Sequence, residues 1–242
     1  MSANDALLLI GHGSARYPDA ASALHGHAGS LRAAGRFRQV EVGLLNGTPS
    51  VVEALARIDA VRVQVVPFFM EVGYFTRVAI PWALGLTGPD PRFHLCPPVG
   101  MHDGMAGLIE RQALAACVTL GIPSRTAAVL VVGHGSASSP GGVLALHQHT
   151  ARVGSTTLFA RVESACLEEA PFVANALQGL RSHPVIVIGF FAGNGAHVRD
   201  DVPSLVAAEE RARGSDGLAV LFQQSVTDDP AMTQIILDQA AR

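Results

Sequence analysis

The feature that most constrains the fold is an internal repeat, in which one four-residue motif recurs 122 residues later. Gly11-His12-Gly13-Ser14 reappears as Gly133-His134-Gly135-Ser136. The same offset relates further pairs along the chain, which include Val40 and Val162, Pro49 and Pro171, Phe68 and Phe190, Gly73 and Gly195, Arg77 and Arg199, and Pro81 and Pro203. A chance match would not keep its register over such a length. The sequence therefore predicts two homologous lobes, residues 1–122 and 123–242.

Each lobe is predicted to alternate strands and helices. Short runs rich in Val and Ile, bounded by Gly, Pro or Asp, indicate strands that are buried on both faces of a sheet. These runs cover residues 6–10, 61–69, 127–132 and 185–191, and helices are predicted over 19–34, 50–58, 104–119, 144–152, 172–180 and 201–211. The alternation predicts an α/β fold, with a four-stranded, mostly parallel sheet in each lobe and helices on both faces. Such sheets bind ligands at the carboxyl ends of their strands.

Composition and charge exclude several classes of protein and site. A net charge of −3 without a cluster of Lys and Arg gives little attraction for nucleic acid. The three cysteines are odd in number and widely spaced, which argues against a disulfide framework, a cysteine zinc site and an iron–sulfur cluster. The sequence shows neither a signal peptide nor an apolar stretch near the roughly 20 residues of a membrane span. We therefore expect a cytoplasmic protein that does not enter membranes.

Two histidines of the second half lie where a ligand would bind. His134 follows a predicted strand and stands between two glycines, which let the backbone turn sharply. His197 follows another strand after the glycine-rich turn 193–195. A lone histidine in such a place could equally cap the next helix. Two histidines at neighbouring strand ends can converge on one divalent cation, because neutral imidazole suits cobalt, iron, nickel and zinc.

The motifs of the second half together resemble a known family. The spaced elements are Gly133-His134-Gly135-Ser136, Leu167-Glu168 followed by Pro171, and Gly195-Ala196-His197 followed by Asp201-Val202-Pro203. This set resembles the class II tetrapyrrole chelatases, and most closely the sirohydrochlorin cobaltochelatase/ferrochelatase group of cobalamin and sirohaem synthesis. The resemblance implies a lyase that inserts Co²⁺ or Fe²⁺, with Ni²⁺ a further candidate, into sirohydrochlorin or a related tetrapyrrole. It also implies that His134 and His197 bind the metal.

Insertion of a metal into a tetrapyrrole requires the cation to lose water ligands and two pyrrole N–H protons to leave. Histidines can hold the metal or accept those protons, and a nearby carboxylate can pass them to solvent. Glu168 is the candidate for this carboxylate, as the third catalytic residue beside His134 and His197. Alternatively, Glu168 is an exposed acid at a helix start, where it stabilises the helix dipole. Asp201 precedes Pro203 and is expected only to cap the helix that begins there.

The substrate carries many carboxylates, so its binding surface should present cations and N–H donors around a flat apolar floor. Arg199 and its counterpart Arg77 are the best-placed arginines, and each could bind a carboxylate through two hydrogen bonds. Most arginines are instead solvated surface groups, which is the alternative for both. Gly135, Ser136 and Tyr74 complete the predicted substrate-binding set.

The first half departs from the motif in an informative way. Its replacements are Phe75 for His197, Val78 and Ala79 for Asp200 and Asp201, and Asn46 for Glu168. A phenyl ring cannot ligate a cation, so the first half is expected to have lost chelation and to keep a structural or substrate-covering role. His12 is interpreted as a relic, and the alternatives are a weak second metal site and a substrate contact. Glu71 could also face the substrate.

Two further hypotheses stay open. One is a non-catalytic protein, derived from a chelatase, that binds a tetrapyrrole or a metal. The other is a hydrolase or phosphatase, but histidine phosphatases need an arginine where Gly133 stands, and Ser136 lacks the Gly-x-Ser-x-Gly setting of an exposed nucleophile. A sirohydrochlorin-type tetrapyrrole is the expected partner, and either a monomer or a homodimer is compatible with two lobes in one chain.

Overall fold

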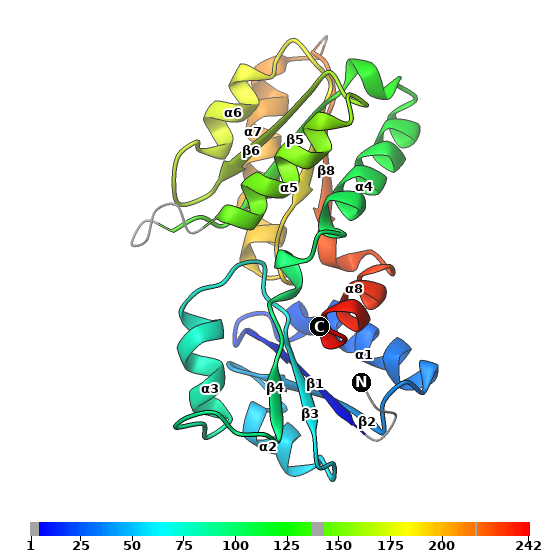
Figure 1. Ribbon diagram of the computed structural model, residues 1–242. Coiled ribbons are helices and arrows are strands. Elements are labelled where there is room, and N and C mark those ends of the chain that lie inside the picture. The colour runs from blue at the N-terminus through cyan, green and yellow to red at the C-terminus, as the bar shows by residue number, and fades with distance from the viewer. Residues whose placement is uncertain (1–4, 137–142, 216) are drawn as a thin grey trace. The chain divides into compact units, whose positions relative to one another are not determined.

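The computed structural model describes residues 5–136, 143–215 and 217–242, and its chain divides into two compact units (Figure 1). Unit 1 consists of Met1–His102, Ala192–Gly195 and Thr227–Arg242. Unit 2 consists of Asp103–Phe191 and Ala196–Val226.

Unit 1 is built on a parallel sheet of four strands in the order β2-β1-β3-β4. The strands are β1 (Ala6–Gly11), β2 (Gln39–Leu44), β3 (Val63–Pro67) and β4 (Phe93–Leu95). Its helices are α1 (Ser22–Ala34), α2 (Val51–Ala56), α3 (Ile80–Ala83) and α8 (Met232–Ala240). One face of the sheet packs against α2 and α3 in a continuous apolar cluster, while α1 and α8 pack together (Figure 1).

Unit 2 repeats this plan with the strand order β6-β5-β7-β8, again with parallel pairing. The strands are β5 (Ala128–Gly133), β6 (Arg161–Cys166), β7 (Val185–Gly189) and β8 (Val220–Ser225). The helices are α4 (Met105–Leu120), α5 (Leu144–Ser155), α6 (Val173–Gly179) and α7 (Val202–Arg213). The predicted α/β class, with two parallel sheets and helices on both faces, is confirmed.

The central strands follow from their composition. Every residue of β1 and of β5 is buried, as expected for apolar runs that are covered by helices on both sides. Helix ends also follow local rules: Ser50 and Glu53 form a capping box at the start of α2, and α4 ends at Gly121 in the left-handed conformation. In the described part of the chain, no helix is both long and apolar enough to cross a membrane.

The two units exchange their last helices, which the sequence pattern did not predict. Helix α4 follows β4 in the chain but packs against α5, β7 and β8 of unit 2. Helix α8 follows β8 but packs against α1 and β3 of unit 1. An amphipathic pattern shows that a helix covers a sheet without showing which sheet it covers. The boundary at residue 122 thus separates the two copies of the sequence repeat. The compact units have other boundaries, because α4 belongs to unit 2 and α8 to unit 1.

Candidate metal-binding site

His134 and His197 stand at the carboxyl ends of two neighbouring strands of unit 2. His134 follows β5 directly, and His197 begins a π-helical turn, His197–Asp201, a short distance after β7. The chain leaves β5 for β6 on one side, and β7 lies on the other side. Ligands of doubly wound sheets bind at such a switch point. The fold therefore brings the two predicted histidines together.

The two imidazole rings are in contact. Their centroids are 4.4 Å apart and the planes meet at 86°, so that an edge of one ring faces the other. Phe191 stacks on His197 with its centroid 5.9 Å away, which fixes the plane of that ring. The pair is partly open to solvent, with side-chain exposures of 49% for His134 and 34% for His197. A ligand from solvent can therefore reach both rings.

The hydrogen bonds of the pair determine which nitrogen each ring offers. His134 Nδ1 lies 2.8 Å from the carbonyl oxygen of Gly135, which can only accept a hydrogen bond, so Nδ1 carries the proton. In the neutral ring this leaves Nε2 with a free lone pair. His197 Nδ1 lies 2.7 Å from Oδ2 of Asp201, which again places the proton on Nδ1. Both rings thus offer Nε2 as the basic nitrogen, as histidine metal ligands commonly do.

Asp201 is a partner of the histidine pair that the sequence interpretation missed. It was expected only to cap α7, but the helical backbone begins earlier, at His197, and Asp201 already has helical dihedral angles. In the described structure its carboxylate makes no cap hydrogen bond and accepts one from His197 instead. The capping interpretation was therefore wrong. The spacing of four residues, which places two helical side chains on one face, was the signal that could have identified it.

Glu168 lies beside the histidine pair. One oxygen of its half-exposed carboxylate is 3.7 Å from Nε2 of His134, and its backbone N–H donates to the carbonyl oxygen of His134 at 2.9 Å. The alternative interpretation, an acid at a helix start, is not supported, because α6 begins only at Val173. Glu168 belongs to the loop after β6 and follows closely on Cys166, the last residue of that strand.

Gly135 shows why the motif needs glycine after the histidine. Its φ of 73° lies in the left-handed region. A Cβ atom there would also come within 2.8 Å of side-chain atoms of Cys166 and Glu169. Any larger residue would strain the turn that presents His134.

Unit 1 contains an equivalent arrangement in which Phe75 replaces His197, while Asn46 and Ala79 stand where unit 2 has Glu168 and Asp201. His12 Nδ1 donates to the carbonyl oxygen of Gly13 at 2.8 Å, as His134 does to Gly135. Phe75 takes the place of His197: its centroid is 4.7 Å from that of His12 at 81°, and it stacks on Phe69 at 5.8 Å. The phenyl ring thus reproduces the packing of the imidazole without its nitrogen atoms. One imidazole remains where unit 2 has two.

The other predicted residues lie around these two places. Arg199 is exposed on the π-helical turn of unit 2, and Ser136 is partly buried directly after the motif. Arg77 and Tyr74 are exposed on the equivalent segment of unit 1, and Glu71 is partly buried before it. These placements test none of the substrate-binding assignments, which remain predictions.

His27 and the three cysteines have structural surroundings. His27 is buried and hydrogen-bonded to the carbonyl oxygen of Thr227 and the hydroxyl of Thr233, within unit 1. The three cysteines form no disulfide and are buried, and burial raises the pKa of Cys96 to about 12. Among residues 5–136, 143–215 and 217–242, no group of three or more His, Cys, Asp and Glu side chains is arranged to hold a metal ion.

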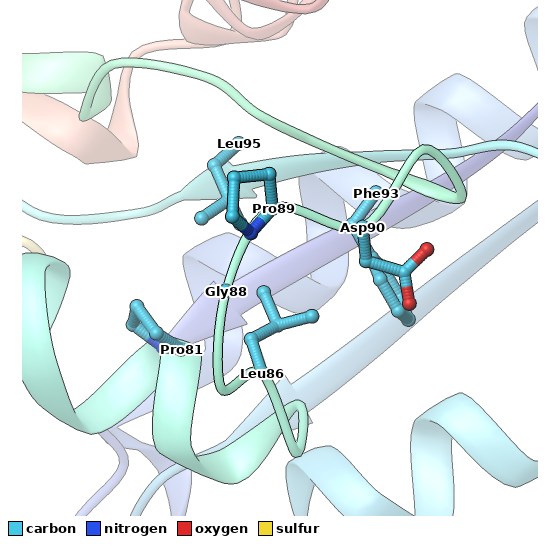
Figure 2. Close-up of a pocket in the computed structure, with 7 residues that line it drawn as sticks. All are labelled: Pro81, Leu86, Gly88, Pro89, Asp90, Phe93 and Leu95. Carbon is cyan, nitrogen blue, oxygen red and sulfur yellow. The ribbon is translucent and has the colours of Figure 1, made fainter.

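A separate hollow of 410 Å³ lies between α3 and β4 of unit 1 (Figure 2). It is lined by Pro81, Leu86, Gly88, Pro89, Asp90, Phe93 and Leu95. The lining is largely apolar, and Oδ1 of Asp90 accepts a hydrogen bond from the backbone of Arg92 at 2.8 Å. The lining contains no histidine, so the hollow itself offers no imidazole to a metal ion.

Both halves of the chain match one known protein family. The model of the CbiX family matches residues 6–116 and again residues 128–242. A protein of Halobacterium salinarum named "Probable sirohydrochlorin cobaltochelatase" is 25% identical over 270 residues, which cover 98% of this chain and 90% of the relative.

Two solved structures share the fold at 25% sequence identity. DR2241 of Deinococcus radiodurans, described as a multi-domain protein with structural similarity to chelatases, has a TM-score of 0.83; the match covers 98% of this chain and 55% of that larger protein. CbiX, described as the terminal enzyme for biosynthesis of siroheme in denitrifying bacteria, has a TM-score of 0.72 with 98% of both chains covered. With one match in each half, this chain belongs to the CbiX family.

Proposed function

We propose that the protein is a lyase that inserts a divalent metal into sirohydrochlorin or a closely related tetrapyrrole. The observation that carries this proposal is the contact between His134 and His197, each with Nδ1 engaged and Nε2 available. The name of the Halobacterium relative supports cobalt as the first metal to test. Iron and nickel remain candidates, because imidazole and carboxylate ligands accept all three.

In this mechanism the Nε2 atoms of His134 and His197 hold the incoming cation as a substrate. Two neutral imidazoles leave most coordination positions to water and then to the pyrrole nitrogens of the ring. Asp201 and the Gly135 carbonyl oxygen keep the protons on the two Nδ1 atoms. The metal can therefore be transferred without a change of tautomer in either ring.

Insertion of one divalent cation releases two protons from the pyrrole N–H groups. His134 accepts a proton at Nε2 once that atom has released the metal, and the imidazolium then lies 3.7 Å from the Glu168 carboxylate. Glu168 passes the proton to solvent, to which its side chain is half exposed. Repetition of this step removes the second proton and restores the neutral pair.

The substrate carboxylates are assigned to Arg199 and to the turn at Gly135 and Ser136, with Arg77 and Tyr74 as further contacts in unit 1. Guanidinium groups suit this task because they bind a carboxylate through two parallel hydrogen bonds. In unit 1, His12 is a relic that does not bind the metal, since its neighbour Phe75 offers no ligand atom.

The test is an absorbance assay of Co²⁺ insertion into sirohydrochlorin, with the uncatalysed rate as the baseline. We expect the wild-type protein to accelerate insertion and His197→Phe, which introduces the residue of unit 1, to abolish the acceleration. His197→Phe retains ring packing, so lost activity reports the missing nitrogen rather than misfolding. A wild-type protein that binds the ring but never accelerates insertion would instead be a tetrapyrrole carrier.

A further inference from the structure

Unit 1 exposes a row of apolar side chains on the helical segment that follows β3. Phe75, Val78 and Trp82 form this apolar stripe, with exposed fractions of 40%, 49% and 81%. They are spaced by three and four residues along the π-helical turn and α3, so they share one face of the helix. Tyr74, which is also exposed, packs edge-on against Phe75 at its start.

The apolar stripe begins at the ligand-binding end of the sheet. Phe75 contacts the ring of His12, which directly follows β1, and the segment itself follows β3. From Phe75 the stripe runs roughly 10 Å along the helix to Trp82, given about 1.5 Å of rise per residue. Its length thus suits a flat ligand of several fused or linked rings.

Comparison with unit 2 shows that the fold does not require apolar residues here. The positions of Tyr74, Phe75, Val78 and Trp82 are occupied in unit 2 by Ala196, His197, Asp200 and Ser204. Unit 2 forms the same π-helical turn and the following helix with these smaller or polar side chains. Exposed apolar surface is costly in water and gathers at binding sites. Packing within the fold therefore accounts for part of Phe75 but not for the exposed Val78 and Trp82, which point to a ligand.

The charge of the segment indicates what kind of ligand this is. Residues 72–84 include Arg77 and no carboxylate, whereas the equivalent residues 194–206 include Asp200 and Asp201. Arg77 is exposed, next to Val78 in the sequence. A flat apolar surface beside a guanidinium group suits a planar, largely apolar ring with carboxylate substituents.

We propose that Phe75, Val78 and Trp82 bind the face of the tetrapyrrole ring, with Arg77 paired to one of its carboxylates. The identity of the ligand rests on the proposed function, but the binding requires no metal. The site of the lost histidine in unit 1 has thus become a platform for the ring.

The experiment measures the dissociation constant of metal-free sirohydrochlorin from the change in its visible absorbance on titration with protein. Trp82→Ser and Val78→Asp each introduce the residue of unit 2. We expect each to weaken binding roughly tenfold, through loss of a stacked ring or addition of a charge that repels carboxylates. Trp82→Phe keeps an aromatic ring and should bind nearly as well as the wild type. Val61→Ser alters a valine that is 88% exposed just before β3, at the other end of that strand, and serves as the matched control.

Metal titration shows that a variant is intact, and tryptophan fluorescence gives a second measure of ring binding. Co²⁺ titration of Val78→Asp should match the wild type, because the histidine pair of unit 2 is unchanged. Trp82 is the only tryptophan of the chain, so quenching of its fluorescence gives a second measure of ring binding in the wild type.

Unchanged ring affinity in both Trp82→Ser and Val78→Asp would overturn the proposal. A wild-type dimer that Val78→Asp dissociates without loss of ring affinity would show instead that the stripe joins two copies of the chain. A failure of the proposed function would look different. In that case the ring would bind in a way that depends on the stripe, but no metal would be inserted, and the proposal for the stripe would still hold.

Discussion

The hydrogen-bond partners of Nδ1 fix the tautomer of the rings of His134 and His197. One of these partners could be predicted from the sequence and the other could not. The carbonyl oxygen of Gly135 is part of the motif that identified His134. Asp201 was hidden because Pro203, two residues later, signals a helix start, whereas the helical backbone already begins at His197. A π-helical turn has no local sequence pattern that would have predicted that earlier start.

Asp201→Asn is expected to weaken Co²⁺ binding by about 10- to 100-fold, the usual effect of losing a carboxylate that orients a histidine ligand. The amide lacks the charge that holds the proton on Nδ1 of His197. A Co²⁺ titration followed by visible absorption measures the change. Asp200→Asn, on the same turn, is the control and should bind as the wild type does. Equal affinities for both variants would mean that Asp201 does not orient His197.

The segment that follows β3 or β7 is the element in which the two units differ most in chemistry. Its π-helical turn has the same shape in both units, and Phe75 or His197 packs on a phenylalanine in each. The repeat offset predicted these substitutions from the sequence. The shared backbone explains why a metal ligand could be replaced without a change of fold.

This equivalence predicts that a metal site can be rebuilt in unit 1. The double variant Phe75→His with Ala79→Asp places a histidine beside His12 and a carboxylate four residues after it. We expect the number of Co²⁺ ions bound per chain to rise from one to two, as measured by equilibrium dialysis. Phe75→His alone should bind the second ion more weakly, and a ratio that stays at one would refute the equivalence.

Helix α7 is held at its C-terminal end by a buried ion cluster. Glu209 accepts hydrogen bonds from Arg181 at 2.8 Å and from Arg213 at 3.0 Å, and Glu209 and Arg213 are buried. The hydrogen bond from Arg181 is the main cause that lowers the pKa of Glu209 below its ordinary value of 4.5, with a further one from Arg213. The folded protein therefore keeps this carboxylate ionised at pH values where the unfolded chain binds a proton.

Glu209→Gln should lower the free energy of unfolding by about 3–5 kcal/mol at pH 7, because it leaves the buried guanidinium group of Arg213 without its counter-ion. In the wild type this stabilisation is complete above pH 4.5 and is lost as the pH falls through the lower folded pKa. The difference between variant and wild type should shrink accordingly in urea unfolding at decreasing pH. Glu210→Gln, an exposed neighbour, is the control; a constant difference at all pH values would contradict this account.

At the scale of the whole molecule, the sequence predicted two α/β copies but not the exchange of α4 and α8. The repeat and the short apolar runs determine the four strands β1, β3, β5 and β7, in which every residue is buried. Which sheet a helix covers depends on the path of the chain between distant elements. Local periodicity contains no information on that path.

The exchange predicts reciprocal effects of two matched substitutions. Ile236→Ala, on α8, should destabilise unit 1, and Ile109→Ala, on α4, should destabilise unit 2, each by about 2–5 kcal/mol for a buried isoleucine. Amide hydrogen exchange measured by mass spectrometry should accelerate in β1 and β3 for Ile236→Ala and in β5 and β7 for Ile109→Ala. The opposite pattern would show that each sequence half folds with its own last helix.

The central claim is that metal insertion depends on the histidine pair of unit 2 and not on the single histidine of unit 1. The most direct measurement compares the rates of Co²⁺ insertion into sirohydrochlorin by His134→Ala and His12→Ala, two substitutions at equivalent motif positions. We predict that His134→Ala loses the acceleration while His12→Ala retains it. Loss of the acceleration in His12→Ala with retention in His134→Ala would contradict the account.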